Sequence, residues 1–331
     1  MFRILTLLVF IPFLSFSNDC VSGDCINGVG TYENTRGETY VGTWKNGKAH
    51  GKGTYTNAKG DKYYGDWVNG DMRGSGTYEY VNGDVYQGEF FGYEKHGQGT
   101  YKSVLGEVYS GQYYHGKRHG SGSFSDAAGN RYEGNWENGL KHGDGTCYYA
   151  DGSKYLGKFH LGEKQGKGSF YWANGGSYMG EFYHNEFNGT ATRIYANGDR
   201  YEGEFKNGLK HGQGKYFYAN GSKYEGGFKQ NKKNGKGVFI WADGGSFTGQ
   251  FSNNTLNGFG TRIYASGEKY IGNFTNGKKN GTGTYYSLTG DSYKGSWVNN
   301  VKHGSGIYLM SNGNKVQCVW KNDVLIKYKK L

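Results

Sequence analysis

The sequence predicts an all-β protein, an elongated single-layer antiparallel meander of about 13 stacked β-hairpin repeats. Three observations support this fold class. The chain has 331 residues with 62 Gly, 32 Tyr, 19 Phe and 7 Trp but one Pro, so aromatic rings rather than aliphatic side chains must form the core. A pattern of 23 residues recurs without insertion from Gly28 to Ile326. Within it, glycine and aromatic positions alternate with a period of two, which is typical of strands.

Each repeat contains a predicted turn at its tenth position, counted from Gly28. That position is glycine in all thirteen copies, from Gly37 to Gly313. Asn or Asp precedes it in seven copies, and only glycine enters the left-handed region without steric penalty. A Gly-x-Gly pair at positions 1 and 3 keeps the same period and fails only at Ala191. Position 10 is therefore expected to close a hairpin.

The register of that hairpin follows from the turn. A three-residue loop over positions 8 to 10 pairs position 5 with 13 and position 3 with 15. The aromatic residues at 5 and 13 then face each other on one side of the sheet, beside the two glycines. The other face carries positions 12, 14 and 16, for example Arg200, Glu202 and Glu204, and is expected to be solvated. No helical pattern covers the aromatic face, so the hairpins are expected to stack edge to edge.

The first residues resemble an export signal. Arg3 precedes an apolar run from Ile4 to Leu14, which is too short to span a bilayer, and Ser17 offers a cleavage site. An exported chain is therefore expected, secreted, periplasmic or at the cell surface and not integral to a membrane; an uncleaved anchor and a lipid-modified Cys20 are the alternatives. The expected organisation is a signal peptide at residues 1–17, an N-terminal cap at 18–27, the repeat array at 28–326 and a tail at 327–331.

The four cysteines fall into two pairs. Cys20 and Cys25 are close enough in sequence to form a disulfide in an oxidising compartment. Cys147 takes an aromatic position and Cys318 a glycine position seven repeats later, so a straight ribbon excludes a bond between them. Buried free thiols or a link to another chain are the two remaining interpretations.

The combination of Gly-x-Gly-x-Tyr, glycine 10, Tyr-x-Gly-x-Trp and an Asn-Gly or His-Gly loop resembles MORN (membrane occupation and recognition nexus) repeats. The resemblance covers Gly28 to about Ile326. Val316 and Cys318 depart from the pattern in the last copy, which suggests a terminal cap. The resemblance implies an array of β-hairpins that associates with proteins and contacts phospholipids.

No motif predicts catalysis, a cofactor or a metal site. The segment Gly42 to Lys48 is similar to a phosphate-binding loop, but Ala49 replaces the required Ser or Thr and no helix follows. Six histidines share position 23, roughly 10 Å apart in adjacent units, too far to share one ion, and are expected in loops or turns. We therefore expect no enzyme, no cofactor, no small-molecule substrate and no nucleic acid partner.

Two groups of cationic residues are the candidate ligand contacts. Arg193 and Arg262 replace the aromatic residue at position 5, where they either stack on neighbouring rings or receive a carboxylate or phosphate. Lysines also follow position 17 in many repeats and are expected to line up as a basic rim along one edge, which either protects the edge or binds an anionic surface. The lysine candidates are Lys117, Lys141, Lys210, Lys232, Lys233, Lys278 and Lys279.

These features favour an exported, non-enzymatic repeat scaffold. It would bind another protein, or a second copy of itself, through its aromatic groove or basic rim. The alternative is a peripheral binder of anionic phospholipid membranes. A third interpretation is a cell-wall or glycan-binding array, because aromatic hairpins can stack on sugars.

Overall fold

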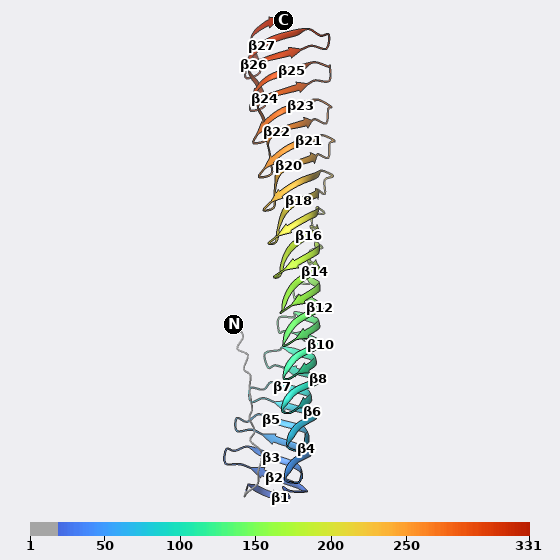
Figure 1. Cartoon of the computed structure of the whole chain (residues 1–331), viewed down its shortest axis with the longest axis vertical. Helices are drawn as coiled ribbons and strands as arrows, with labels where there is room; N and C mark the ends of the chain where they lie inside the picture. The colour runs from blue at the N-terminus through green and yellow to red at the C-terminus, as the bar shows by residue number, and fades with distance from the viewer. Residues whose placement is uncertain (1–18) are drawn as a thin grey trace. The chain divides into compact units, whose positions relative to one another are not determined.

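The computed structural model describes residues 19–331, and every regular element in this range is a β-strand (Figure 1). The predicted all-β class is confirmed. No helix that could cross a membrane occurs between residues 19 and 331. The predicted signal peptide at residues 1–17 lies outside the described residues.

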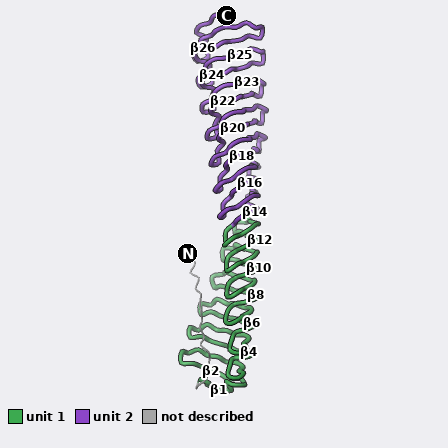
Figure 2. Tube along the Cα trace, in the orientation of Figure 1, with its two compact units in different colours: residues 1–163 green, residues 164–331 purple. Residues whose placement is uncertain are grey.

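The chain divides into two compact units, residues 1–163 and residues 164–331, which Figure 2 colours green and purple. Unit 1 contains β1 (Cys20–Gly23), β2 (Val29–Glu33), β3 (Thr39–Lys45), β4 (Lys48–Thr56), β5 (Lys62–Val68), β6 (Asp71–Glu79), β7 (Val85–Phe91), β8 (Glu94–Lys102), β9 (Val108–Tyr114), β10 (Lys117–Ser125), β11 (Arg131–Glu137), β12 (Leu140–Tyr148) and β13 (Lys154–His160). Each strand of this unit pairs antiparallel with its neighbours in chain order.

Unit 2 repeats the same arrangement. It contains β14 (Glu163–Tyr171), β15 (Ser177–Tyr183), β16 (Glu186–Ile194), β17 (Arg200–Lys206), β18 (Leu209–Phe217), β19 (Lys223–Lys229), β20 (Lys232–Ile240), β21 (Ser246–Ser252), β22 (Thr255–Ile263), β23 (Lys269–Thr275), β24 (Lys278–Tyr286), β25 (Ser292–Val298), β26 (Val301–Leu309), β27 (Lys315–Lys321) and β28 (Val324–Lys330). Its strands also pair antiparallel in chain order.

The hairpin register agrees with the prediction. Between β4 and β5, Tyr55 faces Tyr63 and Gly53 faces Gly65, which are positions 5 with 13 and 3 with 15. Just beyond the strand ends the Asn57 N–H donates to the Asp61 carbonyl at 2.9 Å, and this pair encloses a loop of three residues, 58–60. Gly60, at position 10, has φ of +95°. The glycine signal at this position therefore does mark the turn that sets the register.

The connection from one repeat to the next is a second, tighter hairpin. Asn69 and Gly70 both have positive φ, as a two-residue type I′ turn requires, and they bring Trp67 opposite Met72. A β-bulge follows at position 1, where Gly74 has φ of +90°. The strand therefore resumes at position 21. The position-23 histidines, such as His211 in β18, lie in strands, so the prediction of loop or turn histidines was wrong.

Tyrosine at position 13 forms the centre of eleven of the thirteen repeats, and Phe247 and Val316 take its place in the other two. Tyr40 is 1% exposed and lies over Gly53, where an added Cβ would fall 2.2 Å from the tyrosine oxygen. Its ring meets Trp44 and Trp67 edge to face, with centroids 4.9 and 5.1 Å apart. Each tyrosine thus links the position-17 ring of its own repeat to that of the next. We call the face that carries positions 3, 5, 7, 13, 15, 17 and 22 the ring-lined face, and its opposite the outer face.

The cysteines occupy three different settings. A disulfide joins Cys20 to Cys25, whose Cα atoms are 6.0 Å apart, at the start of unit 1. Cys147 and Cys318 are buried free thiols in units 1 and 2 respectively. In unit 1, the sulfur of Cys147 lies 3.6 Å from the Lys141 ammonium on the ring-lined face.

Candidate functional site

Four of the predicted rim lysines lie on the ring-lined face instead: Lys141, Lys210, Lys233 and Lys279. Lys210, at position 22, faces Phe205 across the two-residue turn, and its ammonium lies 4.5 Å from the centroid of the Tyr216 ring. Because the turn has two residues, position 18 pairs with position 21 on the outer face, and position 17 pairs with position 22 on the ring-lined face. The four lysines occupy position 22, so the prediction that they lie on the rim was wrong.

The three remaining lysine candidates do lie at the edge. Lys117, Lys232 and Lys278 occupy position 21, at the start of their strands, and are exposed. The same position carries Glu94 in unit 1 and Glu186 in unit 2. The edge is therefore mixed in charge and is not the uniform basic rim that the sequence predicted.

Arg193 and Arg262 stack on aromatic rings. The guanidinium carbon of Arg193 lies 4.5 Å from the centroid of Trp172, and that of Arg262 lies 3.3 Å from Trp241. Nε of Arg193 and Nη1 of Arg262 are buried and have no hydrogen-bond partner within residues 19–331. The stacking interpretation describes their packing, and the unpaired N–H groups leave capacity for an acceptor.

The ring-lined face of unit 2 carries one cation in every second strand. Where position 22 is apolar, as at Phe187 and Leu256, position 5 of the same strand is Arg193 or Arg262. The seven residues from β14 to β26, which we call the cation row, are Lys164, Arg193, Lys210, Lys233, Arg262, Lys279 and Lys302. Unit 1 has three equivalent cations, Lys95, Arg118 and Lys141, and has Ala49 and Met72 at position 22 of β4 and β6.

Lysine and arginine reach the same kind of place from different positions. In four cases the cation lies over the position-7 ring that follows the preceding even-numbered strand. The distances to the ring centroid are 5.5 Å for Lys210 over Tyr195, 5.3 Å for Lys233 over Tyr218, 4.5 Å for Arg193 over Trp172 and 3.3 Å for Arg262 over Trp241. The cation thus comes from position 22 in some strands and from position 5 in others, but it contacts a position-7 ring in both cases.

Burial disfavours the protonated form of these lysines and lowers their pKa values. Burial lowers the pKa of Lys210 to about 8, with smaller contributions from Arg193 and Lys233. Burial also lowers the pKa of Lys233 to about 8 and lowers that of Lys279. In unit 1, burial and then Arg118 lower the pKa of Lys95 to about 8. Attraction to the ring faces offsets part of the desolvation.

Several lysines and arginines of the outer face form ion pairs. On the outer face, Lys158 lies 3.0 Å from Asp144, and Arg200 lies 2.6 Å from Glu202. Within residues 19–331, by contrast, Lys210, Lys233, Lys279 and Lys302 form no ion pair. The nearby Asp199 is engaged elsewhere: it accepts from the Tyr216 hydroxyl at 2.7 Å and from the Ala219 N–H at 2.8 Å. These four lysines of the ring-lined face are therefore without an ion-pair partner among the described residues.

Unit 2, which carries more cations on its ring-lined face, also has the more positive net charge. Unit 2 carries 23 Lys and Arg against ten Asp and Glu, a formal net charge of +13. Unit 1 carries 16 against 18, a formal net charge of −2. Unit 2 is thus the basic part of the chain.

The lysines of unit 2 are also held by the repeat that follows. The Lys210 N–H donates to Oδ1 of Asn231 at 2.9 Å, and the Asn231 N–H donates back to the Lys210 carbonyl at 3.0 Å. Asn or Asp stands at this place after every row lysine, whereas Gly208 and Gly277 follow the apolar residues Phe187 and Leu256. The acceptors are Asn185, Asn231, Asn254, Asn300 and Asp323.

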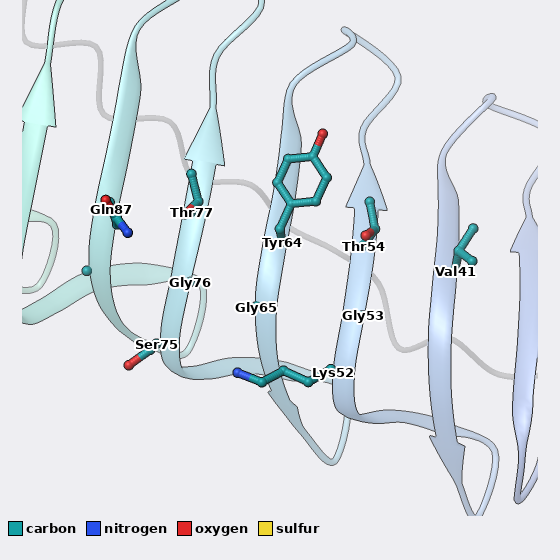
Figure 3. Close-up of a pocket in the computed structure, with 11 residues that line it drawn as sticks. Val41, Lys52, Gly53, Thr54, Tyr64, Gly65, Ser75, Gly76, Thr77 and Gln87 are labelled. Atoms are coloured by element: carbon teal, nitrogen blue, oxygen red, sulfur yellow. The ribbon is translucent and has the colours of Figure 1, made fainter.

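A separate shallow hollow of about 700 Å³ lies on the outer face of β3 to β7 in unit 1 (Figure 3). Glycine pairs such as Gly53 and Gly65 form its floor, and Val41, Thr54, Tyr64, Thr77 and Gln87 stand around it. Its one lysine, Lys52, pairs with Asp66 at 2.6 Å. Residues 19–331 contain no group of three or more His, Cys, Asp or Glu placed to hold a metal ion.

The fold and the repeated ring-over-glycine core define a repeat protein of stacked β-hairpins. The chain belongs to the MORN repeat family. The family model matches residues 40–62, 63–85, 86–104, 109–131, 132–154, 155–177, 178–200, 201–223, 224–246, 247–269, 270–292 and 293–315. It begins each repeat at position 13, so the matches cover the predicted array except half a repeat at each end and residues 105–108. No curated protein sequence matches the chain.

Solved structures give only weak likenesses. The Drosophila melanogaster SAS-4 (dCPAP) TCP domain, in complex with a proline-rich motif of Ana2, is 11% identical, with 53% of this chain and 82% of that chain covered and a TM-score of 0.27. The Danio rerio CPAP TCP10 domain, with a STIL peptide, is 10% identical, with 78% and 95% covered and a TM-score of 0.21. Virginiamycin B lyase from Staphylococcus aureus is 10% identical, with 90% and 96% covered and a TM-score of 0.14. Likenesses at this level identify no function.

Sequence reasoning missed Lys95, Arg118 and Lys164 as members of a site, and it placed Lys302 on the rim. The signal that reveals them is the Asn-Gly pair at positions 19 and 20, as in Asn207-Gly208, which is typical of a two-residue hairpin turn. Such a turn places position 22 in a strand, opposite the ring at position 17.

Proposed function

We propose that this chain is an exported, non-enzymatic MORN repeat scaffold that binds a protein partner on the ring-lined face of unit 2. The observation that carries the proposal is the difference in ion pairing between the two faces. Outer-face cations such as Lys158 and Arg200 have carboxylate partners, whereas the row lysines Lys210, Lys233 and Lys279 have none within residues 19–331. Half-buried cations without partners cost free energy of folding, and a bound anion would recover it.

Two features support export. The signal-like segment with Arg3 and the apolar run Ile4–Leu14 is one. The disulfide between Cys20 and Cys25 is the other, because such bonds persist mainly in oxidising compartments. Detectable turnover of any substrate by the purified protein would contradict the non-enzymatic part of the proposal.

A pair of charge-matched variants tests which surface binds the partner. Lys210→Gln/Lys233→Gln/Lys279→Gln changes the ring-lined face. Lys206→Gln/Lys229→Gln/Lys278→Gln removes the same charge from exposed lysines of unit 2. Both variants and the parent chain would be used to capture crosslinked proteins from the exported fraction of the native organism, with quantitation by mass spectrometry. We expect the first variant to lose the partner and the second to retain it.

The result also decides the second candidate function, binding to anionic phospholipid, which the +13 charge of unit 2 favours. A lipid binder would lose affinity mainly in the exposed-lysine variant, because a flat bilayer meets protruding side chains first. Its affinity for anionic vesicles would also fall steeply with salt. Equal binding to neutral and anionic vesicles would exclude this candidate.

A further inference from the structure

The seven cations of unit 2 form a regularly spaced row. They lie on β14, β16, β18, β20, β22, β24 and β26, and these strands pair in chain order through the intervening odd-numbered strands. Two strands separate each cation from the next, a step of about 9.6 Å. The row from Lys164 to Lys302 therefore extends over about 58 Å across the strands.

An extended polypeptide matches this step. A chain in the polyproline II conformation advances about 3.1 Å per residue with three residues per turn, so every third side chain lies on one face, about 9.3 Å from the one before. A carboxylate at every third position would meet one cation after another, and about 18 residues would span the row.

We propose that the cation row of unit 2 is a track for an extended acidic polypeptide segment that crosses the strands and presents a carboxylate at about every third residue. This inference rests on the proposed function and names its partner class. The half-buried cations would be reached by side-chain carboxylates, whereas a flat lipid surface would contact the exposed lysines of the edge.

Base stacking is not available to a competing nucleic acid partner. The position-13 rings, such as Tyr201 and Tyr270, are 0% exposed beneath their neighbours. The position-7 rings, such as Trp241 and Tyr218, are already covered by Arg262 and Lys233. A nucleic acid would retain only its phosphates for binding.

The fixed position of the charge also points to a ligand. Phe187 and Leu256 replace the row lysine in β16 and β22, and in both strands an arginine at position 5 restores the cation over a position-7 ring. Aromatic packing alone does not require this, because β4 and β6 of unit 1 build the same core with Ala49, Met72 and tyrosine at position 5.

The test uses the full-length chain and two labelled peptides of about 18 residues with identical composition of Glu, Gly and Ser. One peptide has Glu at every third position, and the other has all its Glu residues contiguous. Fluorescence anisotropy at physiological ionic strength gives the two affinities. We expect the spaced peptide to bind about tenfold more tightly, because it meets more of the row at once.

Three variants connect this affinity to the row. Lys210→Gln/Lys233→Gln should weaken binding of the spaced peptide about tenfold, whereas Lys229→Gln/Lys232→Gln, which removes equal charge from exposed positions, should change it less than about twofold. Arg262→Tyr should weaken binding. Leu256→Lys combined with Arg262→Tyr restores the arrangement of Lys210 and Tyr216 and should recover it. Circular dichroism checks that each variant is folded.

Other outcomes overturn the inference in distinguishable ways. Equal affinity for the two peptides would mean unspecific attraction of polyanions. Tighter binding of an oligonucleotide of equal charge would identify a nucleic acid surface. If neither peptide binds but the ring-face triple variant still loses its captured partner, the acidic track is wrong and the proposed function stands. If that variant also keeps its partner, both are wrong.

Discussion

Tyr63 of unit 1 lies over Gly76, and Tyr201 of unit 2 lies over Gly214, with both tyrosines 0% exposed and almost the same distances to the glycine. The surroundings of the two rings differ in charge. Near Tyr63, position 22 of the following strand is Met72, whereas near Tyr201 it is Lys210. The MORN core thus fixes the backbone and tolerates either an apolar or a charged side chain at position 22. In unit 2, from β14 to β26, position 22 is lysine in every repeat except at Phe187 and Leu256.

Adding one methyl group beneath the tyrosine should break both units equally. A Cβ on Gly76 would lie 2.4 Å from the Tyr63 ring, and one on Gly214 would lie 2.5 Å from the Tyr201 ring. Gly76→Ala and Gly214→Ala should each reduce the free energy of unfolding by about 3 kcal/mol, because the ring has no space to move. Chemical denaturation followed by circular dichroism measures the loss.

A matched control already exists in the chain. Ala191 occupies the same position in unit 2, and in that repeat Tyr178 stacks on Phe187 with centroids 3.9 Å apart. Ala191→Gly should therefore have a small effect compared with Gly214→Ala. A loss confined to one of the two units would contradict the view that they share one core.

The sequence predicted this core well and the charged site poorly. Glycine 10, the aromatic residues at 5 and 13 and the three-residue loop were sufficient for the register between β4 and β5. The position of Lys210 depended on where its strand begins: the two-residue turn at Asn207 and Gly208 starts β18 at Leu209, whereas the sequence predicted a loop edge after position 17. The β-bulge at Gly212 adds two residues and so keeps Lys210 on the same face as Gly214.

The charge difference between the units should appear in the pH dependence of stability. Lys210 and Lys233, with a pKa of about 8, bind fewer protons in the folded state than in the unfolded state between pH 8 and about 10. Stability should therefore rise with pH in this window, by about 1 kcal/mol per lysine after allowance for screening. The charges that face Lys210 are Arg193, Lys233 and Asp199.

Substitution of the lysines shows which unit causes the rise. Lys210→Met/Lys233→Met should remove most of it, and Lys95→Met in unit 1 should remove less, because one lysine is lost instead of two. Denaturation curves at several pH values between 7 and 10 provide the measurement. Above about pH 10 the trend should reverse, because tyrosines such as Tyr201, whose pKa burial raises, stay protonated only in the folded state. A flat profile below pH 10 would show that the row lysines are solvated.

The smallest expected effect concerns the asparagines that hold the row lysines in unit 2. Asn231 has φ of +68°, and its side chain accepts the Lys210 N–H at 2.9 Å, whereas the equivalent residue in unit 1, Gly116, offers no side chain to Lys95. Asn231→Gly removes the hydrogen bond and relieves the left-handed backbone, so its cost should stay below about 1 kcal/mol. Asn231→Ala should cost more, because it removes the bond and keeps the strain. Gly116→Asn carries the unit 2 arrangement into unit 1, and protection of the Lys95 amide in hydrogen exchange should increase if the asparagine, and not the lysine, makes this backbone rigid.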